Sequence, residues 1–174
     1  MAFDPALNEI LLLGFSLRGE METWAWSGTT WQQLHPANSP SNRIGASLAG
    51  DAGTGQVVLF GGFSQSIGYL NDTWIWNGAS WALSAPANSP SSRVNASMAF
   101  DGSVHELILH GGGSSTTFLH DTWAWDGKQW ILLIANQAQF HSATEATECG
   151  AHTCLVEGGQ QVWQWQAGSW TTPA

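Results

Sequence analysis

The chain has 174 residues, of which 43% are hydrophobic, and its 4 basic and 13 acidic side chains give a net charge of −9. This length suits one domain with a buried core. Nucleic-acid-binding and membrane-surface proteins contact phosphate groups through clusters of Lys and Arg, and a chain with so few basic residues has no such clusters. The longest aliphatic run, Ile10–Leu13, is far shorter than the roughly 20 residues that span a bilayer, so we expect neither nucleic acid nor membrane as a partner.

Four short segments recur along the chain and are clearest in its second quarter. They predict strands at Arg43–Ala49, Gln56–Phe60, Asp72–Trp76 and Ser80–Leu83. The last two are joined by Asn77-Gly78, a dipeptide that tolerates the positive φ of a tight hairpin turn. No window shows sustained apolar spacing at i, i+3, i+4 and i+7, so no helix is expected.

All twelve Trp residues belong to one repeated pattern, W-x-W-x-G-x-x-W. The four copies comprise Trp24, Trp26 and Trp31; Trp74, Trp76 and Trp81; Trp123, Trp125 and Trp130; and Trp163, Trp165 and Trp170. Their offsets of 50, 49 and 40 residues are typical of solenoids and propellers. Since every Trp fits the register, we expect most of them to be packing residues rather than ligand contacts.

The repeat divides one domain, residues 1–174, into units at approximately 1–36, 41–86, 91–135 and 140–173. Each unit is interpreted as a four-stranded antiparallel sheet covered on both faces, which is typical of a propeller blade. The small residues Gly45, Ala46 and Ser47 suit an innermost strand, where blades crowd around the axis, and Trp suits the wider outer strands.

An aliphatic run, a Gly pair such as Gly61-Gly62, a variable loop and then spaced aromatic residues resemble the kelch repeat. The form N-D-T-W-x-W-x-G-x-x-W at Asn71–Trp81 is similar to bacterial kelch proteins related to the central domain of galactose oxidase. The resemblance implies an all-β, kelch-type β-propeller with about sixteen short strands.

Four units leave the closure of such a propeller open, since propellers typically have about 4–8 blades. The chain is interpreted as a partial propeller, and two alternatives remain: a protomer that completes a ring with another copy, and a small four-bladed ring. An incomplete array would expose sheet edges and Trp-lined faces, which favours self-association.

The topology places the loops Phe63–Asn71 and Gly113–His120 on the same face as the starts of the first strands. Variable loops on a rigid scaffold are where recognition usually lies. The candidate binding residues on this face are Arg43, Arg93, His141, Tyr69, Phe118 and His120. The kelch resemblance implies that this face binds peptide segments through Arg near the first strand. The alternative is that each Arg pairs with Asp72 or Asp121 at the same rim.

Catalytic chemistry is not expected, and the chain is predicted not to be an enzyme. A copper site of the galactose oxidase type needs several Tyr and His ligands and a Cys–Tyr crosslink, whereas this chain has the single Tyr69, with both Cys in the last unit. Five His residues, His105, His110, His120, His141 and His152, show no ligand spacing, so no metal and no other cofactor are expected. A glycosidase would need two facing carboxylates, and most Asp residues recur at turns. We expect a non-catalytic scaffold that binds a protein or peptide; the alternative is a carbohydrate-binding or structural propeller portion of a larger secreted enzyme.

The two cysteines, Cys149 and Cys154, flank a tight turn in the last unit. Facing positions of a hairpin have Cα atoms about 4.5–5.5 Å apart, within disulfide range. A disulfide and two free thiols both remain open. A disulfide together with the Trp-rich, Lys-poor composition favours an extracellular or cell-surface location.

Overall fold

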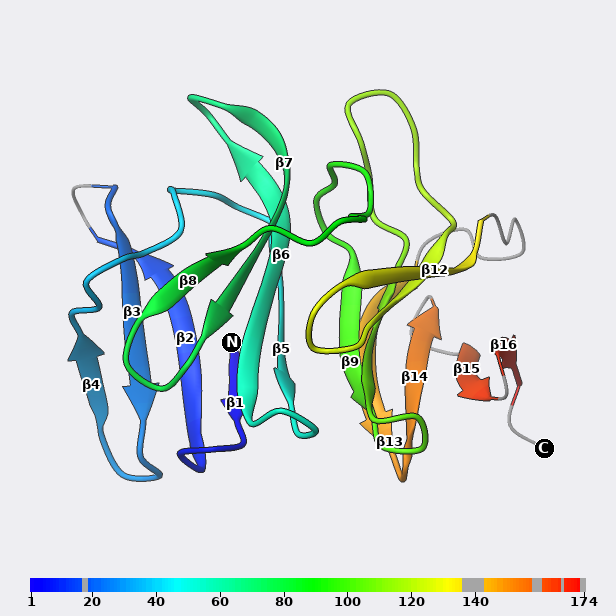
Figure 1. Cartoon of the computed structure of the whole chain (residues 1–174), viewed down its shortest axis with the longest axis horizontal. Helices are drawn as coiled ribbons and strands as arrows, with labels where there is room; N and C mark the ends of the chain where they lie inside the picture. The colour runs from blue at the N-terminus through cyan, green and yellow to red at the C-terminus, as the bar shows by residue number, and fades with distance from the viewer. Residues whose placement is uncertain (17–18, 136–142, 158–160, 167, 173–174) are drawn as a thin grey trace.

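The computed structural model describes the chain except residues 17–18, 136–142, 158–160, 167 and 173–174 (Figure 1). The described residues form sixteen strands and no helix, arranged in four antiparallel sheets of four strands each. The all-β fold class and the four-stranded units predicted from the sequence are therefore confirmed. In each sheet the strands follow one another in chain order.

The four sheets are numbered along the chain. The first sheet comprises β1 (Ala2–Asp4), β2 (Glu9–Phe15), β3 (Met21–Trp26) and β4 (Trp31–Leu34). The second comprises β5 (Ser47–Asp51), β6 (Gln56–Ser64), β7 (Gly68–Trp76) and β8 (Trp81–Ser84). The third comprises β9 (Ser97–Asp101), β10 (Glu106–His110), β11 (Thr122–Trp125) and β12 (Trp130–Ile134). The fourth comprises β13 (Ala143–Cys149), β14 (His152–Glu157), β15 (Gln161–Gln166) and β16 (Ser169–Thr171).

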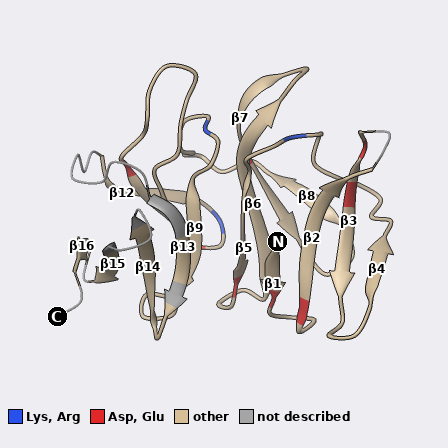
Figure 2. Cartoon of the chain, turned by 180° about the vertical axis from the view of Figure 1, so that it is seen from behind, with Lys and Arg blue, Asp and Glu red and all other residues tan. Residues whose placement is uncertain are grey.

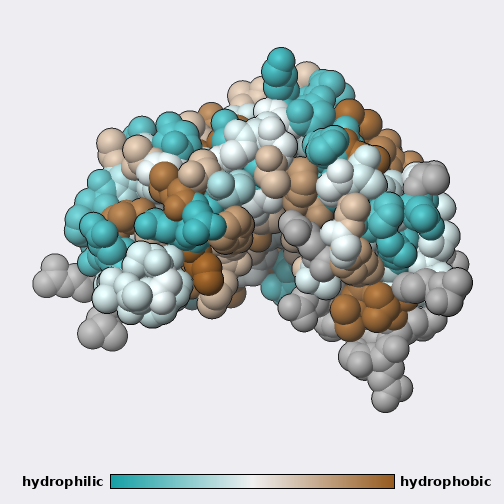
Figure 3. Space-filling view, turned by 90° about the horizontal axis from the view of Figure 1, so that it is seen from below, coloured by the Kyte–Doolittle hydropathy of each residue, from teal (hydrophilic) through white to brown (hydrophobic). Residues whose placement is uncertain are grey.

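The sheets stand beside one another in chain order, with the first strand of each on the inside. Strand β5 contacts both β1 and β9, and β9 also contacts β13. In the view from behind, Asp and Glu residues lie near the ends of several strands (Figure 2). Seen from below, the molecule is an arch hollowed between its two arms (Figure 3). The inner strands therefore face a shared space, while the Trp-bearing third and fourth strands lie further out.

The turn between the third and fourth strands shows how the sequence forms these sheets. In the second sheet Asn77 Oδ1 accepts hydrogen bonds from the backbone N–H groups of Ala79 and Ser80, at 3.1 and 3.0 Å. Gly78 follows at φ 90°, a conformation that is costly for residues with a side chain. The turn aligns Trp76 directly opposite Trp81, with ring centroids 5.5 Å apart.

Apolar clusters fill the spaces between successive sheets, and the Trp residues dominate them. Between the second and third sheets, Val58 and Phe60 pack with Leu107, Trp125 and Trp130, all of them buried. Equivalent clusters join the first sheet to the second and the third to the fourth. Burial of such large aromatic side chains supplies a major part of the stabilisation of each interface.

The last Trp of the second, third and fourth triplets also donates a hydrogen bond across the interface. Trp81 Nε1 donates to Thr23 Oγ1 at 3.1 Å. Trp130 Nε1 and Trp170 Nε1 donate in the same way to the corresponding threonines of their preceding sheets, at 2.9 and 3.0 Å. The same Trp–Thr bond thus recurs at three interfaces and fixes the register of one sheet against the next.

Two predicted boundaries were wrong. The strand predicted at Arg43–Ala49 begins only at Ser47. Residues 43–46 instead cross the Gly pair of the same sheet, where they form a single bridge between Ile44 and Phe63. The predicted loop Phe63–Asn71 is largely strand: β6 continues to Ser64 and β7 begins at Gly68. Pairing of Phe63 with Tyr69, whose ring centroids are 5.1 Å apart, extends this hairpin beyond the sheet.

Candidate functional site

The candidate site is one end of the sheets, which we call the loop end. It comprises the β6–β7 and β10–β11 connections and the linkers 35–46 and 85–96, whereas the tight hairpins lie at the opposite end (Figure 1). The β6–β7 hairpin and the β10–β11 loop project beyond the sheets at this end (Figure 1).

Arg43 anchors the first linker to the second sheet. Its Nη1 and Nη2 donate to the two carboxylate oxygens of Asp72 at 2.5 and 2.8 Å. The other N–H groups reach Gly61 O, Ser41 O and Ser41 Oγ at 2.9–3.0 Å. All five N–H donors of the guanidinium are occupied by the protein, and the side chain is 1% exposed.

Arg93 repeats this arrangement in the third sheet. It binds Asp121 with two hydrogen bonds of 2.6 and 2.8 Å, and Gly111 O, Ser91 O and Ser91 Oγ at 2.9–3.1 Å. A planar guanidinium held by a carboxylate and three further acceptors is a rigid anchor. The linkers at the loop end are therefore fixed at equivalent points.

The carboxylates in these pairs are held in their charged form. Burial alone would raise the pKa of Asp72, but hydrogen bonds from Arg43 and Trp74 and the charge of Arg43 outweigh it and lower that pKa below its ordinary value. Trp74 Nε1 donates to Asp72 at 2.7 Å. The same holds for Asp121. Burial alone would raise its pKa, but hydrogen bonds from Arg93 and Trp123 and the charge of Arg93 outweigh burial and lower that pKa.

The Gly pair leaves room for each linker to lie against its sheet. At Gly62, φ is 103°, and a Cβ would stand 3.0 Å from Ile44 O and 3.1 Å from the Ala46 side chain. At Gly112 it would stand only 2.7 Å from Val94 O. The pair is thus required by the close approach of the linker, and the anchored Arg lies beside it.

These contacts correct the expectation that Arg43 and Arg93 touch a ligand. Both side chains are buried, and neither has an N–H donor left, so the alternative, pairing with Asp72 and Asp121, describes their role. His141, the third residue expected at this position, lies outside the described residues.

The aromatic candidates lie at the surface of the loop end. Phe118 is 72% exposed and forms a bridge to Gly113 within the β10–β11 loop. Tyr69 is 36% exposed and stacks edge-on against Phe63. His120 is half-buried at the base of the same loop as Phe118. The structure therefore places Tyr69 and Phe118 where they can contact a partner.

Sequence reasoning missed two aliphatic residues of this surface. Ile67, at the tip of the β6–β7 hairpin, is 64% exposed, and Ile44, in the first linker, is 62% exposed. The available signal was that each stands as an isolated aliphatic residue within a segment of Ser, Gly and Asn. The two aliphatic and two aromatic side chains, Ile44, Ile67, Tyr69 and Phe118, are called the apolar loop set below.

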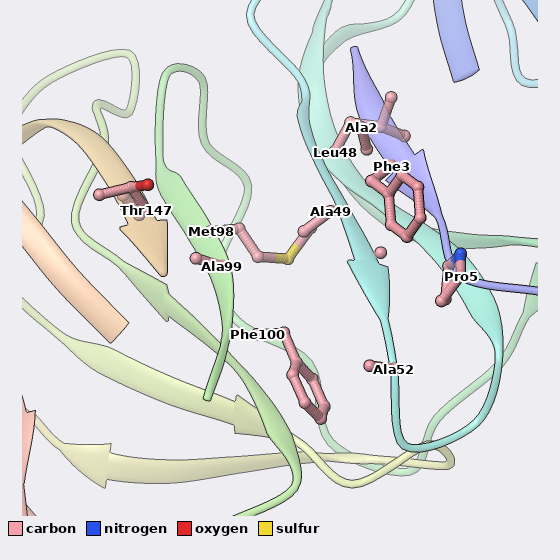
Figure 4. Close-up of a pocket in the computed structure, with 12 residues that line it drawn as sticks. Ala2, Phe3, Pro5, Leu48, Ala49, Ala52, Met98, Ala99, Phe100 and Thr147 are labelled. Atoms are coloured by element: carbon pink, nitrogen blue, oxygen red, sulfur yellow. The ribbon is translucent and has the colours of Figure 1, made fainter. Parts of the chain in front are cut away.

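A second feature is a cavity of about 300 Å³ lined by all four inner strands (Figure 4). Phe3, Ala49, Met98 and Thr147 represent β1, β5, β9 and β13 in its wall. The lining contains no ionisable side chain, so it offers neither an acid–base pair nor a charged ligand contact.

The recurring aspartates at the ends of the inner strands serve turns and contacts between sheets. Asp51 Oδ1 accepts hydrogen bonds from the N–H groups of Gly53 and Thr54, at 2.9 and 3.2 Å. Asp101 Oδ2 accepts one from the buried N–H of Thr153 in the fourth sheet, at 2.8 Å. Within the described part of the chain, no group of three or more His, Cys, Asp or Glu is placed to hold a metal ion. No helix long and apolar enough to cross a bilayer occurs in that part.

The two cysteines form a disulfide between β13 and β14. The Cα atoms of Cys149 and Cys154 are 5.8 Å apart. Cys154 is buried beside the turn, on the side of the fourth sheet that faces away from the third. The bond therefore joins the two strands of a hairpin within one sheet rather than linking two sheets.

Among known proteins, no protein-family model matches this chain, and no curated protein matches it. The resemblance to the kelch repeat therefore rests on the repeated motifs alone.

Proposed function

We propose that the four sheets are blades of a kelch-type β-propeller, and that the loop end is a non-catalytic surface for a protein or peptide segment. The propeller assignment is supported by the W-x-W-x-G-x-x-W repeat, by the inner position of each first strand and by the recurring Trp–Thr bond between sheets. Repeated sheets that pack face to face around a shared space are the architecture of propellers.

The observation that carries the recognition proposal is the apolar loop set. Its members are exposed, yet they lie on an end whose linkers are anchored by buried Arg–Asp pairs. Apolar side chains that project from a rigid base lose little conformational freedom on binding, and aromatic residues among them are typical of interface hot spots. The chemistry favours an apolar or mixed peptide segment.

Because both arginines are buried, their proposed role is to support the binding surface. Arg43 and Arg93 hold the backbone from which Ile44 and the adjacent loops project. They position the surface without touching the partner. Loss of an arginine should therefore reduce folding stability as well as binding, whereas loss of Phe118 should reduce binding alone.

The test is selection of peptides from a display library on the folded chain, followed by affinity measurement with variants. We expect Phe118→Ala and Tyr69→Ala each to weaken the selected peptides about 10-fold or more while the thermal midpoint stays within a few degrees. Leu83→Ala is the matched control, because Leu83 is an exposed apolar residue of β8 outside the loop end. Equal affinity of the Phe118 and Tyr69 variants and wild type would contradict the proposal.

Carbohydrate binding is the second candidate, and the exposed ring of Phe118 supports it. An uncovered aromatic face can stack on a sugar ring, and Phe118 is the most exposed aromatic side chain of the loop end. The exposed aliphatic side chains of Ile44 and Ile67, also at the loop end, favour a peptide instead. A glycan array that is positive with wild type and negative with Phe118→Ala would move the assignment to carbohydrate.

A further inference from the structure

Each sheet has two chemically different faces. The Trp face carries the second and third Trp of the triplet, and it packs against the preceding sheet; in the third sheet it includes Trp125 and Trp130. The Thr face carries the threonine that accepts the Trp N–H, such as Thr73 in the second sheet, and it packs against the following sheet. Contact of a Trp face with a Thr face occurs at all three interfaces between the sheets.

The Trp face of the first sheet has no described sheet against it. Trp31 is 42% exposed, whereas its counterparts Trp81, Trp130 and Trp170 are 1–3% exposed. Phe3 on the same face is 52% exposed, whereas its counterpart Phe100 is buried. This face therefore carries the same kinds of residue as the faces buried between sheets, but no described sheet covers it.

The opposite free surface lies on the fourth sheet. Its Thr face, which points away from the third sheet, has Val162 in the position of Thr23, Thr73 and Thr122. Val162 is 40% exposed. Gln164 follows on the same face, paired with Cys154. The first and fourth sheets stand at opposite ends of the row of sheets (Figure 1), and no described sheet lies against the Trp face of the first or the Thr face of the fourth.

We propose that these two faces bind each other between copies of the chain: the Trp face of the first sheet docks on the Thr face of the fourth sheet of a second copy. The interface would continue the packing seen three times within the chain. It joins two different surfaces, so it is head-to-tail and can close into a ring or extend.

The first sheet differs from the second at the position of the Gly pair. In the second sheet, a Cβ at Gly62 would press on the linker at Ile44 and Ala46. The corresponding residue of the first sheet is Phe15, and β2 runs opposite β3 there without the irregularity seen at Gly62. At this position the first sheet therefore differs from the second, where the linker into the first strand crosses the Gly pair. A second copy is the partner proposed because one chain carries both a Trp face and a Thr face.

The chemistry of the contact also predicts its strength. Val162 cannot accept the N–H of Trp31, but the amide oxygen of Gln164, the next residue on that face, can do so. Without the buried Trp–Thr bond, association should be weaker than packing within the chain. Each copy carries a net charge of −9, so long-range repulsion opposes association, and added salt should strengthen it.

The experiment is sedimentation velocity over about 1–100 µM protein, a range suited to micromolar affinity. Wild type should associate, while Trp31→Glu and Val162→Glu should each be at least 10-fold weaker. Leu83→Glu, an apolar-to-acidic change at another exposed position, on β8, is the matched control and should associate like wild type. Circular dichroism checks folding, and Gln164→Lys replaces Val162→Glu if that variant unfolds.

Mixing the two acidic variants is the decisive step. Each keeps one intact face, so a head-to-tail interface predicts that the mixture forms a dimer of one copy of each, which neither variant forms alone. Wild type that stays monomeric throughout would overturn the proposal. So would self-association of Val162→Glu at wild-type strength, because it would show two Trp faces binding each other.

Discussion

The first and third sheets contain the same Trp hairpin in different surroundings. The ring centroids of Trp26 and Trp31 are 5.4 Å apart with planes at 44°, and those of Trp125 and Trp130 are 5.2 Å apart with planes at 50°. The local geometry is thus nearly the same, yet Trp31 is 42% exposed and Trp130 only 1%. The hairpin sequence sets how the rings meet, and the neighbouring sheet sets whether they are buried.

Truncating the two residues should therefore have very different effects. Trp130→Ala removes a fully buried ring and should lower the free energy of unfolding by about 3–5 kcal/mol. Trp31→Ala, at an exposed position, should cost less than about 1 kcal/mol. Urea unfolding in dilute protein measures both, and equal losses would show that the hairpin alone determines the contribution of the ring.

The Arg anchors offer a second contrast between sheets. Arg93→Ala leaves the carboxylate of Asp121 partly buried without its cation, and we expect a loss of about 3 kcal/mol. In the first sheet the corresponding acid is Glu22, which accepts a hydrogen bond of 3.0 Å from Trp24. Glu22→Ala should be clearly less costly than Asp121→Ala, and the reverse order would contradict an anchoring role.

The same anchors predict the response to acid. Because the folded-state pKa values of Asp72 and Asp121 are lowered, their contribution is fully present above the ordinary aspartate pKa of 3.8 and is lost as pH falls through the folded-state values. Arg93→Ala should shift the midpoint of acid unfolding upwards. A midpoint unchanged from wild type would show that the pair contributes nothing to pH-dependent stability.

The disulfide distinguishes the fourth sheet from the other three. Titration of the unfolded, unreduced protein should find no reactive thiol, since Cys149 and Cys154 are bonded. Reduction opens a loop closed by residues five apart, and we expect a loss of about 2 kcal/mol. Two thiols before reduction would contradict the bond, and unchanged stability after it would show that the sheet does not depend on it.

The smallest predicted effect concerns the Trp–Thr bond. Thr73→Val keeps the shape of the side chain but leaves the buried Nε1–H of Trp130 without its acceptor, at a cost of about 1–2 kcal/mol. Thr73→Ser retains the hydroxyl and is the matched control. Val162→Thr at the uncovered face should be neutral in dilute protein. A neutral Thr73→Val would remove the bond from the account of sheet packing.

Much of this arrangement could be predicted because it repeats. The register of the twelve Trp predicted that most of them pack, and the shared rim of Arg43 and Asp72 made their pairing an explicit alternative. The extension of the β6–β7 hairpin could not be predicted, since it depends on Phe63 meeting Tyr69 across two strands. The exposure of Ile44 was missed although its isolation among polar residues was a signal, because the exposure follows from the path of the linker over Gly62.

Hydrogen exchange of the indole N–H groups, followed by NMR in dilute protein, tests most directly whether the neighbouring sheet determines Trp burial. The account predicts slow exchange at Trp81, Trp130 and Trp170 and fast exchange at Trp31. Exchange at Trp130 should accelerate in Thr73→Val and stay slow in Thr73→Ser. Equally slow exchange at Trp31 and Trp130 in monomeric protein would contradict the account.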